Sequence, residues 1–156
     1  MQTQTIAPMQ KRVDLIPANV LVGKASTRKK KLRVAAYCRV STAQEEQQSS
    51  YAAQIAYYTD KISQNKDWEL AGIFADEGIT GTSTKKRDEF LKLMALCEKG
   101  KIDMVLTKSV SRFSRNTLDA ITYIRKLKAK GIPIIFEKEG INTMQMRGDK
   151  YIFAGV

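Results

Sequence analysis

The chain has 156 residues, of which 27 are Lys or Arg and 16 are Asp or Glu, so its formal charge is +11. It contains no His and two cysteines, Cys38 and Cys97, which excludes His-based acid–base chemistry, a His-ligated metal and a disulfide framework. No apolar run approaches the roughly 20 residues of a membrane span, and the stretch 16–22 is too broken for a signal-peptide core. We therefore expect a soluble, cytoplasmic, basic protein with a single folded domain.

The positive charge is concentrated at the start of the chain. Residues 1–31 contain seven Lys or Arg and one acid, Asp14, which gives this segment a net charge of +6. The segment shows no helical or strand periodicity and ends in a run of four basic residues, Arg28, Lys29, Lys30 and Lys31. We interpret it as a flexible basic arm, for which a solvated tail is a simpler explanation than a specific contact. With a nucleic-acid partner the run would contribute affinity, because neutralising phosphates dominates such binding.

The first predicted strand spans 34–38, a continuous apolar run. A helix from about 43 to 64 follows, marked by four apolar residues at helical spacing, namely Tyr51, Ile55, Tyr58 and Ile62. Thr42 and Glu45 form a capping box at its start, in which each side chain satisfies the free amide of the other residue.

A second strand is predicted at 68–74, followed by a glycine-containing loop at 76–83. The next helix begins at Arg87, ends at Gly100 with a glycine cap, and is lined by Phe90, Leu93, Met94 and Cys97. A third strand is predicted at 103–107.

The last predicted helix begins near Asn116, ends before Gly131 and is lined by Leu118, Ile121, Ile124 and Leu127. A fourth strand follows at 132–136, where Pro133 favours a strand start or an edge position. Strands that alternate with helices through short connections predict an α/β fold, a mostly parallel sheet of four to five strands flanked by helices. In such sheets ligands bind beyond the carboxyl ends of the strands.

The three predicted strand-to-helix loops all carry arginine. The first contains Arg39 and Ser41, the second ends in Lys85, Lys86 and Arg87, and the third contains Lys108, Arg112 and Arg115. Arginines that converge on one sheet edge suit a phosphate, because the planar guanidinium donates in a fork that matches phosphate oxygens.

Each of these residues also has a simpler explanation. Ser41 could cap the first helix, although Thr42 already fills that role, and Arg112 with Arg115 could form one solvated helix face. Arg87 opposes the helix macrodipole, which suggests a reason other than helix stability. Other polar candidates have weaker support, because Asp103 could be a turn acid, Gln54 could lie at the surface and Cys38 could be a small buried hydrophobe. Neither a P-loop nor a G-x-G-x-x-G motif is present, which disfavours nucleotide hydrolysis.

Four ordered motifs resemble the serine recombinases, the resolvase and invertase family with its large integrase and transposon relatives. They are Tyr37-Cys38-Arg39-Val40-Ser41-Thr42, then Asp76-Glu77-Gly78-Ile79-Thr80-Gly81 with Arg87, then Lys99-Gly100-Lys101-Ile102-Asp103, and then Ser111-Arg112-Phe113-Ser114-Arg115-Asn116. Glu139-Gly140-Ile141-Asn142-Thr143 also looks like that family. The resemblance implies a catalytic domain at 32–143, between the arm at 1–31 and a short C-terminal segment at 144–156.

The resemblance implies a transesterification on double-stranded DNA. Ser41 would attack a backbone phosphodiester and form a 5′-phosphoserine link with release of a 3′-hydroxyl. Arginines at family positions would stabilise the crowded phosphate, namely Arg39, Arg87, Arg112 and Arg115, with Gln54 and Asp103 as supporting polar residues. Because the covalent link conserves the bond energy, no cofactor or metal is expected. Lys85, Lys86 and Lys108 are candidate DNA-binding residues together with the basic arm.

Two features depart from the family pattern. The residue before Arg112 is often aspartate in the family but is Ser111 here, and the long dimerising helix of the family has no counterpart in 144–156. We therefore expect weak or absent self-association and incomplete recombination by this chain. Two competing hypotheses are a non-catalytic DNA-binding or regulatory remnant of a recombinase and a small-molecule phosphate-binding α/β protein.

Overall fold

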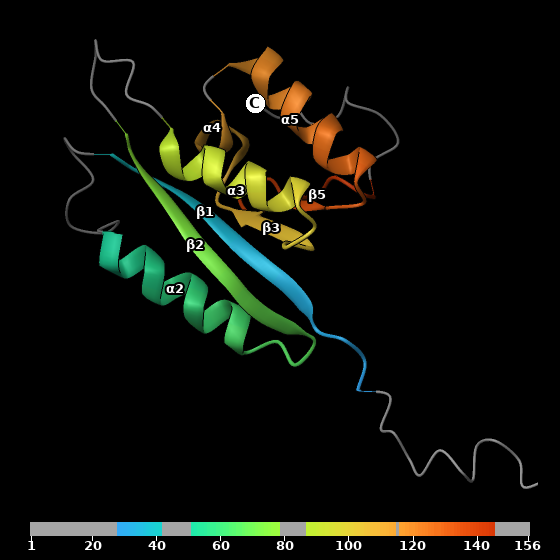
Figure 1. The fold of residues 1–156 in the computed structure, drawn as a ribbon. Helices are drawn as coiled ribbons and strands as arrows, with labels where there is room; N and C mark the ends of the chain where they lie inside the picture. The colour runs from blue at the N-terminus through green and yellow to red at the C-terminus, as the bar shows by residue number, and fades with distance from the viewer. Residues whose placement is uncertain (1–27, 42–50, 79–86, 115, 146–156) are drawn as a thin grey trace, which may run out of the picture.

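The computed structural model describes residues 28–41, 51–78, 87–114 and 116–145, which build a five-stranded sheet (Figure 1). The strand order is β2, β1, β3, β4, β5, in which the first four strands are parallel and β5 pairs antiparallel with β4. The strands are β1 Leu32–Ser41, β2 Trp68–Gly78, β3 Met104–Thr107, β4 Ile134–Phe136 and β5 Ile141–Asn142. The mostly parallel sheet that the sequence predicts is confirmed.

Helices cover both faces of this sheet. α2 (Tyr51–Ser63) packs on one face, whereas α3 (Asp88–Glu98) and α5 (Thr117–Ala129) pack on the other (Figure 1). The short α4 (Val110–Phe113) follows β3 directly. None of the helices in the described ranges is long and apolar enough to cross a bilayer.

The central strand β1 supplies side chains to both layers. Ala35 and Tyr37 belong to the core cluster under α3 and α5, while Val34, Ala36 and Cys38 belong to the cluster under α2. This division follows from the pleat, because successive strand residues point to opposite faces. A strand buried on both faces reads as a continuous apolar run, which is the pattern that identifies it in the sequence.

β1 and β2 are longer than the sequence pattern predicts. They stay paired up to Ser41 and Gly78, so Arg39 and Ser41 lie in β1 and Asp76 lies in β2. The predictions that placed these three residues in loops are wrong. The rest of the expected loop, 79–86, lies outside the described residues, as do 42–50 with the predicted capping box. The sequence does not reveal the end of β2, because the residues past the apolar run have polar side chains while their backbones still pair with β1.

The spacing of apolar residues predicts more buried residues in α2 and α5 than the structure shows. Tyr51 is 55% exposed and Leu118 is 69% exposed, whereas Tyr58, Ile62 and Ile124 are buried as predicted. Tyr51 and Leu118 lie in the first turn of α2 and α5, respectively. Periodicity identifies the face of a helix but does not locate where the underlying sheet ends.

The predicted helix ends are confirmed. Gly100 and Gly131 adopt φ values of +67° and +72°, the left-handed conformation in which glycine ends a helix without steric cost. Pro133 directly precedes β4, as a strand start rather than an edge, because β3 and β5 flank that strand. The turn of helix in α4 was not predicted from the loop composition.

Candidate active site

A small hollow lies at the carboxyl ends of β1 and β3. It is lined by six residues from four segments, namely Tyr37, Cys38, Arg39, Gln54, Lys108 and Arg112. Four of them are predicted site residues that lie far apart in the sequence: Arg39, Gln54, Lys108 and Arg112. The carboxyl end of the sheet thus brings together β1, α2, the β3–α4 connection and α4, as expected for a parallel α/β fold.

Arg112 is positioned by the turn that follows β3. The buried Ser109 caps α4, since its Oγ accepts a hydrogen bond from the Arg112 N–H at 3.2 Å. From this turn the Arg112 guanidinium reaches back and donates through Nη1 to the Arg39 carbonyl at 3.0 Å. This contact joins the ends of β1 and β3 and places two arginines at one hollow.

Arg87 is held beside the same edge from α3. Its guanidinium carbon lies 3.7 Å from the centre of the Phe90 ring, a cation–π contact. The same group donates to the Phe113 carbonyl and lies 3.3 and 3.4 Å from the Tyr37 hydroxyl through Nη2 and Nε. Arg87 is therefore fixed by two side chains and one backbone carbonyl, which explains a cation at a helix N-terminus.

Asp76 performs the capping role that Arg87 cannot. Arg87 occupies the N-cap position of α3 without a side-chain cap hydrogen bond. The Asp76 carboxylate, from β2, instead accepts hydrogen bonds from the Glu89 and Phe90 backbone N–H groups, each at 3.0 Å. A carboxylate at this end also complements the helix macrodipole. A capping carboxylate from a neighbouring strand leaves the Arg87 side chain available to the site.

Tyr37 connects these two groups. Its hydroxyl donates to Asp76 Oδ2 at 3.0 Å and accepts from Arg87, while its ring packs edge-on against Phe90 with centroids 5.1 Å apart. Burial raises the pKa of Tyr37 to about 12, so the phenol stays protonated and neutral at physiological pH. A neutral hydroxyl can serve both as donor to the carboxylate and as acceptor for the guanidinium.

Ser41 is the last residue of β1, two positions after Arg39, with its backbone paired to Gly78. Two strand residues correspond to about 7 Å, so the backbone of Ser41, the predicted nucleophile, lies about that far from the backbone of Arg39, which lines the hollow. Arg115, Lys85 and Lys86 lie outside the described residues. Among the described residues, no group of three or more Cys, Asp or Glu could hold a metal ion.

Asp103 lies at the opposite end of the sheet. It precedes β3 and forms an ion pair with Arg33, whose Nη2 lies 2.9 Å from Asp103 Oδ1. Hydrogen bonds from the Arg33 guanidinium lower the pKa of Asp103 to about 2. Six strand residues, or about 20 Å, separate Arg33 from Arg39. The structure therefore does not bring Asp103 to the hollow, and we do not carry it into the proposed site.

The basic run also lies toward this amino end. Arg28, Lys29, Lys30 and Lys31 are exposed and directly precede β1, and the charge of Lys30 contributes to the low pKa of Asp103. The structure does not place these four side chains at the arginine-lined hollow. Of the predicted DNA-binding residues that are described, only Lys108 lines it.

Tyr37 and Asp76 are site residues that sequence reasoning missed. The sequence pattern places Asp76 at the start of a loop and makes Tyr37 one apolar member of a buried strand. A tyrosine inside a buried strand was the available signal, because its hydroxyl needs a hydrogen-bond partner there. The identity of that partner depends on the pairing of β1 with β2.

The fold and this edge define a class of protein: a parallel α/β domain with an arginine-lined hollow at the carboxyl end of its central strand. The family model described as Resolvase, N terminal domain matches residues 34–154, and the chain belongs to this family of serine recombinases. The Transposon Tn3 resolvases of Escherichia coli and Klebsiella pneumoniae are each 33% identical over 113 residues, 72% of this chain and 54% of theirs. The chain thus spans about half the length of these curated relatives.

Solved structures show the same fold. The N-terminal catalytic domain of TP901-1 integrase superposes with a TM-score of 0.62 at 24% identity, over 77% of this chain and 88% of that one. A resolvase family site-specific recombinase from Streptococcus pneumoniae gives a TM-score of 0.61 at 29% identity, over 75% and 79%. The serine-recombinase resemblance of the sequence motifs is confirmed at the level of family and fold.

Proposed function

We propose that this domain cleaves and rejoins DNA strands by transesterification, with Ser41 as the nucleophile. The observation that carries the proposal is the convergence of Arg39, from β1, and Arg112, from α4, on one hollow at the end of the strand that bears Ser41. A serine hydroxyl is a weak nucleophile, and a cationic site stabilises both its alkoxide and the charged transition state.

The proposed reaction proceeds in two balanced steps. In the first, Ser41 Oγ bonds to the phosphorus of a backbone phosphodiester and loses its proton, while the bond from phosphorus to the 3′-oxygen breaks and that oxygen takes a proton. The products are a 5′-phosphoserine ester and a free 3′-hydroxyl. In the second step a 3′-hydroxyl attacks the phosphoserine ester, restores a phosphodiester and releases Ser41. The number of ester bonds is unchanged, so neither step needs an external energy source.

The arginines have distinct proposed roles. Arg39 and Arg112 line the hollow and would bind the non-bridging oxygens of the phosphate, whose negative charge increases as the fifth bond forms. Arg87 is fixed by Phe90 and Tyr37 and would supply a further positive charge at the same edge. Gln54, from α2, lines the hollow and would orient the phosphate by hydrogen bonding. We include Arg115 in this proposal because of its position in the family motif.

The proposed substrate is double-stranded DNA. Lys108 lies at the site and would bind a phosphate, whereas the run 28–31 at the other end of the sheet would contact more distant backbone.

A covalent-adduct assay tests the proposed chemistry. Duplexes of randomised sequence, each nicked in one strand, allow the cleaved fragment to dissociate, so the phosphoserine ester accumulates. A denaturing gel should show a protein–DNA band that disappears in Ser41→Ala and persists in Ser63→Ala, a matched change at the far end of α2. A band of equal intensity in Ser41→Ala, or no band from the unmodified chain, would contradict the proposal.

A further inference from the structure

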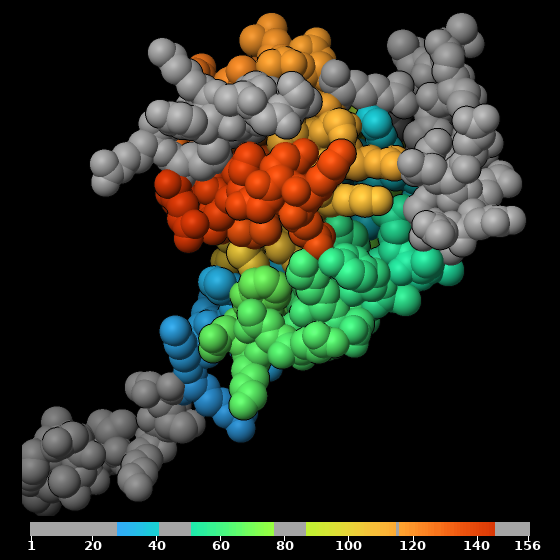
Figure 2. All heavy atoms as spheres, turned by 180° about the vertical axis from the view of Figure 1, so that it is seen from behind, coloured from blue at the N-terminus to red at the C-terminus, as the bar shows by residue number. Residues whose placement is uncertain are grey.

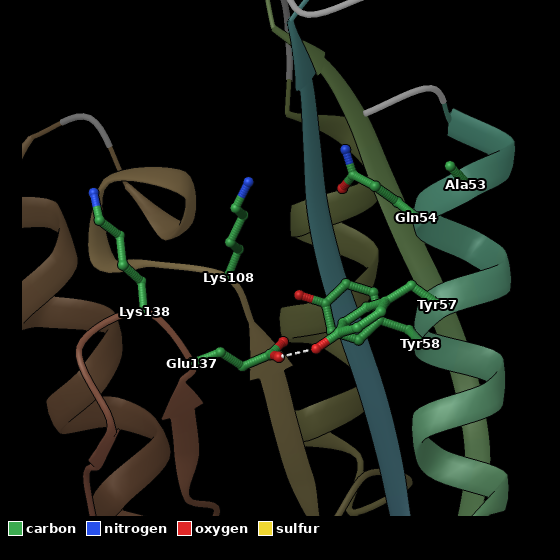
Figure 3. A pocket seen from close by; sticks show the side chains of 7 residues that line it. All are labelled: Ala53, Gln54, Tyr57, Tyr58, Lys108, Glu137 and Lys138. Atoms are coloured by element: carbon green, nitrogen blue, oxygen red, sulfur yellow. Dashed lines mark hydrogen bonds between the residues drawn. The ribbon is translucent and has the colours of Figure 1, made fainter. Parts of the chain in front are cut away.

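A larger pocket adjoins the arginine-lined hollow. It has a volume of about 510 Å³ and lies between α2, the residue after β3 and the turn between β4 and β5 (Figure 3). Figure 2 shows this side of the molecule, where the β4–β5 region (red) and α2 (green) face each other. Gln54 and Lys108 line both the pocket and the hollow, so the two spaces are adjacent. Its volume is within the range of small-ligand sites.

One wall of the pocket is an aromatic ring in a fixed orientation. Tyr57 is 51% exposed, yet its hydroxyl donates to Glu137 Oε2 at 2.6 Å and its ring packs edge-on against buried Tyr58 at 5.0 Å (Figure 3). An exposed tyrosine normally samples several rotamers, and these contacts select one of them. The result is a preformed apolar surface that a planar group can stack on.

The charge of Glu137 is already balanced within the protein. Lys61 donates to Glu137 Oε2 at 2.7 Å. Burial acts to raise the pKa of Glu137, but the hydrogen bonds from Lys61 and Tyr57 outweigh it and hold that pKa below its ordinary value. Glu137 is therefore an ionised anchor for Tyr57 whose charge is offset by Lys61.

Two further lysines stand at the rim of the pocket. The Lys138 backbone N–H donates to the Lys108 carbonyl at 2.7 Å, so the two residues are held side by side. Their side chains extend in the same direction, toward the edge where Gln54 projects (Figure 3). With the charge of Glu137 offset, the lining of this pocket is net positive and suits an anion that also carries a planar apolar group.

We propose that this pocket holds one unstacked nucleotide of the attacked DNA strand, next to the scissile phosphate, with its base on Tyr57 and a flanking phosphate between Lys108 and Lys138. This inference rests on the proposed function for the identity of the strand. Stacking on an aromatic ring tolerates any base, because every base has a π-face. In an intact duplex the base stacks on its neighbours and must leave the stack to enter the pocket, so strand ends and single strands are preferred.

Binding of short DNA strands to the full chain tests the subsite directly. The probes are a fluorescently labelled six-nucleotide single strand and a strand of equal length and charge that carries no bases, measured by anisotropy at fixed salt. Tyr57→Ala should weaken binding of the base-bearing strand by about fivefold or more, which corresponds to the loss of one stacked base. It should leave binding of the abasic strand unchanged, because that strand has nothing to stack.

Two matched variants control for general effects. Tyr51→Ala removes a tyrosine of similar exposure from the same helix, but Tyr51 lies outside this pocket. Lys138→Gln should reduce the dependence of log affinity on log salt by about 0.7, the value for one single-strand phosphate. Lys66→Gln, the same charge change in the turn between α2 and β2, should not change that dependence for a six-nucleotide strand. Tyr57→Phe keeps the ring but loses the hydrogen bond to Glu137, so it should weaken binding less than Tyr57→Ala does.

The outcomes separate this inference from the proposed function. Equal losses for Tyr51→Ala and Tyr57→Ala, or an equal loss of abasic-strand binding, would overturn the subsite. Ser41→Ala should abolish the covalent adduct while leaving the Tyr57-dependent binding intact. If no adduct ever forms but binding still depends on Tyr57 and on bases, the subsite stands and the transesterification fails.

Discussion

Removing the carboxylate of Asp76 should destabilise the domain far more than its position on an edge strand suggests. In Asp76→Ala, α3 loses the acceptor of its Glu89 and Phe90 N–H groups, and the Tyr37 hydroxyl loses its acceptor. A lost helix cap costs about 1 kcal/mol. A buried hydroxyl left without its charged partner costs about 1–3 kcal/mol. The expected decrease in unfolding free energy is therefore about 2–4 kcal/mol.

Thermal unfolding followed by circular dichroism measures this loss. At about 4 °C per kcal/mol for a domain of this size, the midpoint should fall by about 8–16 °C. The matched control is Asp88→Ala, which removes an exposed carboxylate from the first turn of the same helix. That change alters the interaction with the macrodipole and should cost less than about 1 kcal/mol. Equal losses for the two variants would refute the capping role of Asp76.

A double-mutant cycle tests how much of this loss comes from the hydrogen bond between Tyr37 and Asp76. Tyr37→Phe removes the hydroxyl that bridges Asp76 and Arg87 while keeping the ring against Phe90. Tyr37→Phe and Asp76→Ala should be coupled by about 1 kcal/mol, because they share one hydrogen bond. Additive losses would show that the Tyr37 hydroxyl is not bonded to Asp76 in solution.

Two further expectations concern titratable groups that the proposed reaction does not use. The pKa of Asp103 is about 2, below its unfolded value of about 4, so its ion pair with Arg33 should stabilise the fold above pH 4 and lose that effect between pH 4 and pH 2. Because both side chains are partly exposed, urea titrations should show that Asp103→Asn lowers the unfolding free energy by only about 1 kcal/mol at pH 6 and not at all near pH 2. A difference in unfolding free energy that does not change with pH would contradict this. Burial raises the pKa of both Cys38 and Cys97 to about 12, so a chromogenic disulfide reagent at pH 8 should react with them only in urea, and rapid labelling of the native chain would show that the sheet opens readily.

Much of the fold was predictable because its signals are local. The apolar run at 34–38 identified the central strand, and Gly100 and Gly131 marked two helix ends. The limits of β2 were not predictable, since residues such as Asp76 continue the backbone ladder without contributing apolar side chains. Strand ends depend on pairing between distant segments, which a single sequence pattern does not contain.

The candidate site was predictable where topology alone determines it. Arg39 lies near the end of β1 and Arg112 follows β3, and these parallel strands end at the same edge of the sheet. Asp103 shows the limit of assigning a role from a motif. It belongs to a family motif, but it directly precedes β3, and topology places the start of a parallel strand at the end of the sheet opposite to the hollow. Tyr57 could not be identified from the sequence, because its role depends on the turn that carries Glu137 lying against α2.

Peptide mapping of the covalent adduct tests the central claim most directly. After nuclease and trypsin digestion, a residual nucleotide should be found on the peptide from residue 40 to residue 61, and fragmentation should locate it on Ser41. A nucleotide on the peptide that carries Ser109 and Ser111, or on any residue other than Ser41, would contradict the account.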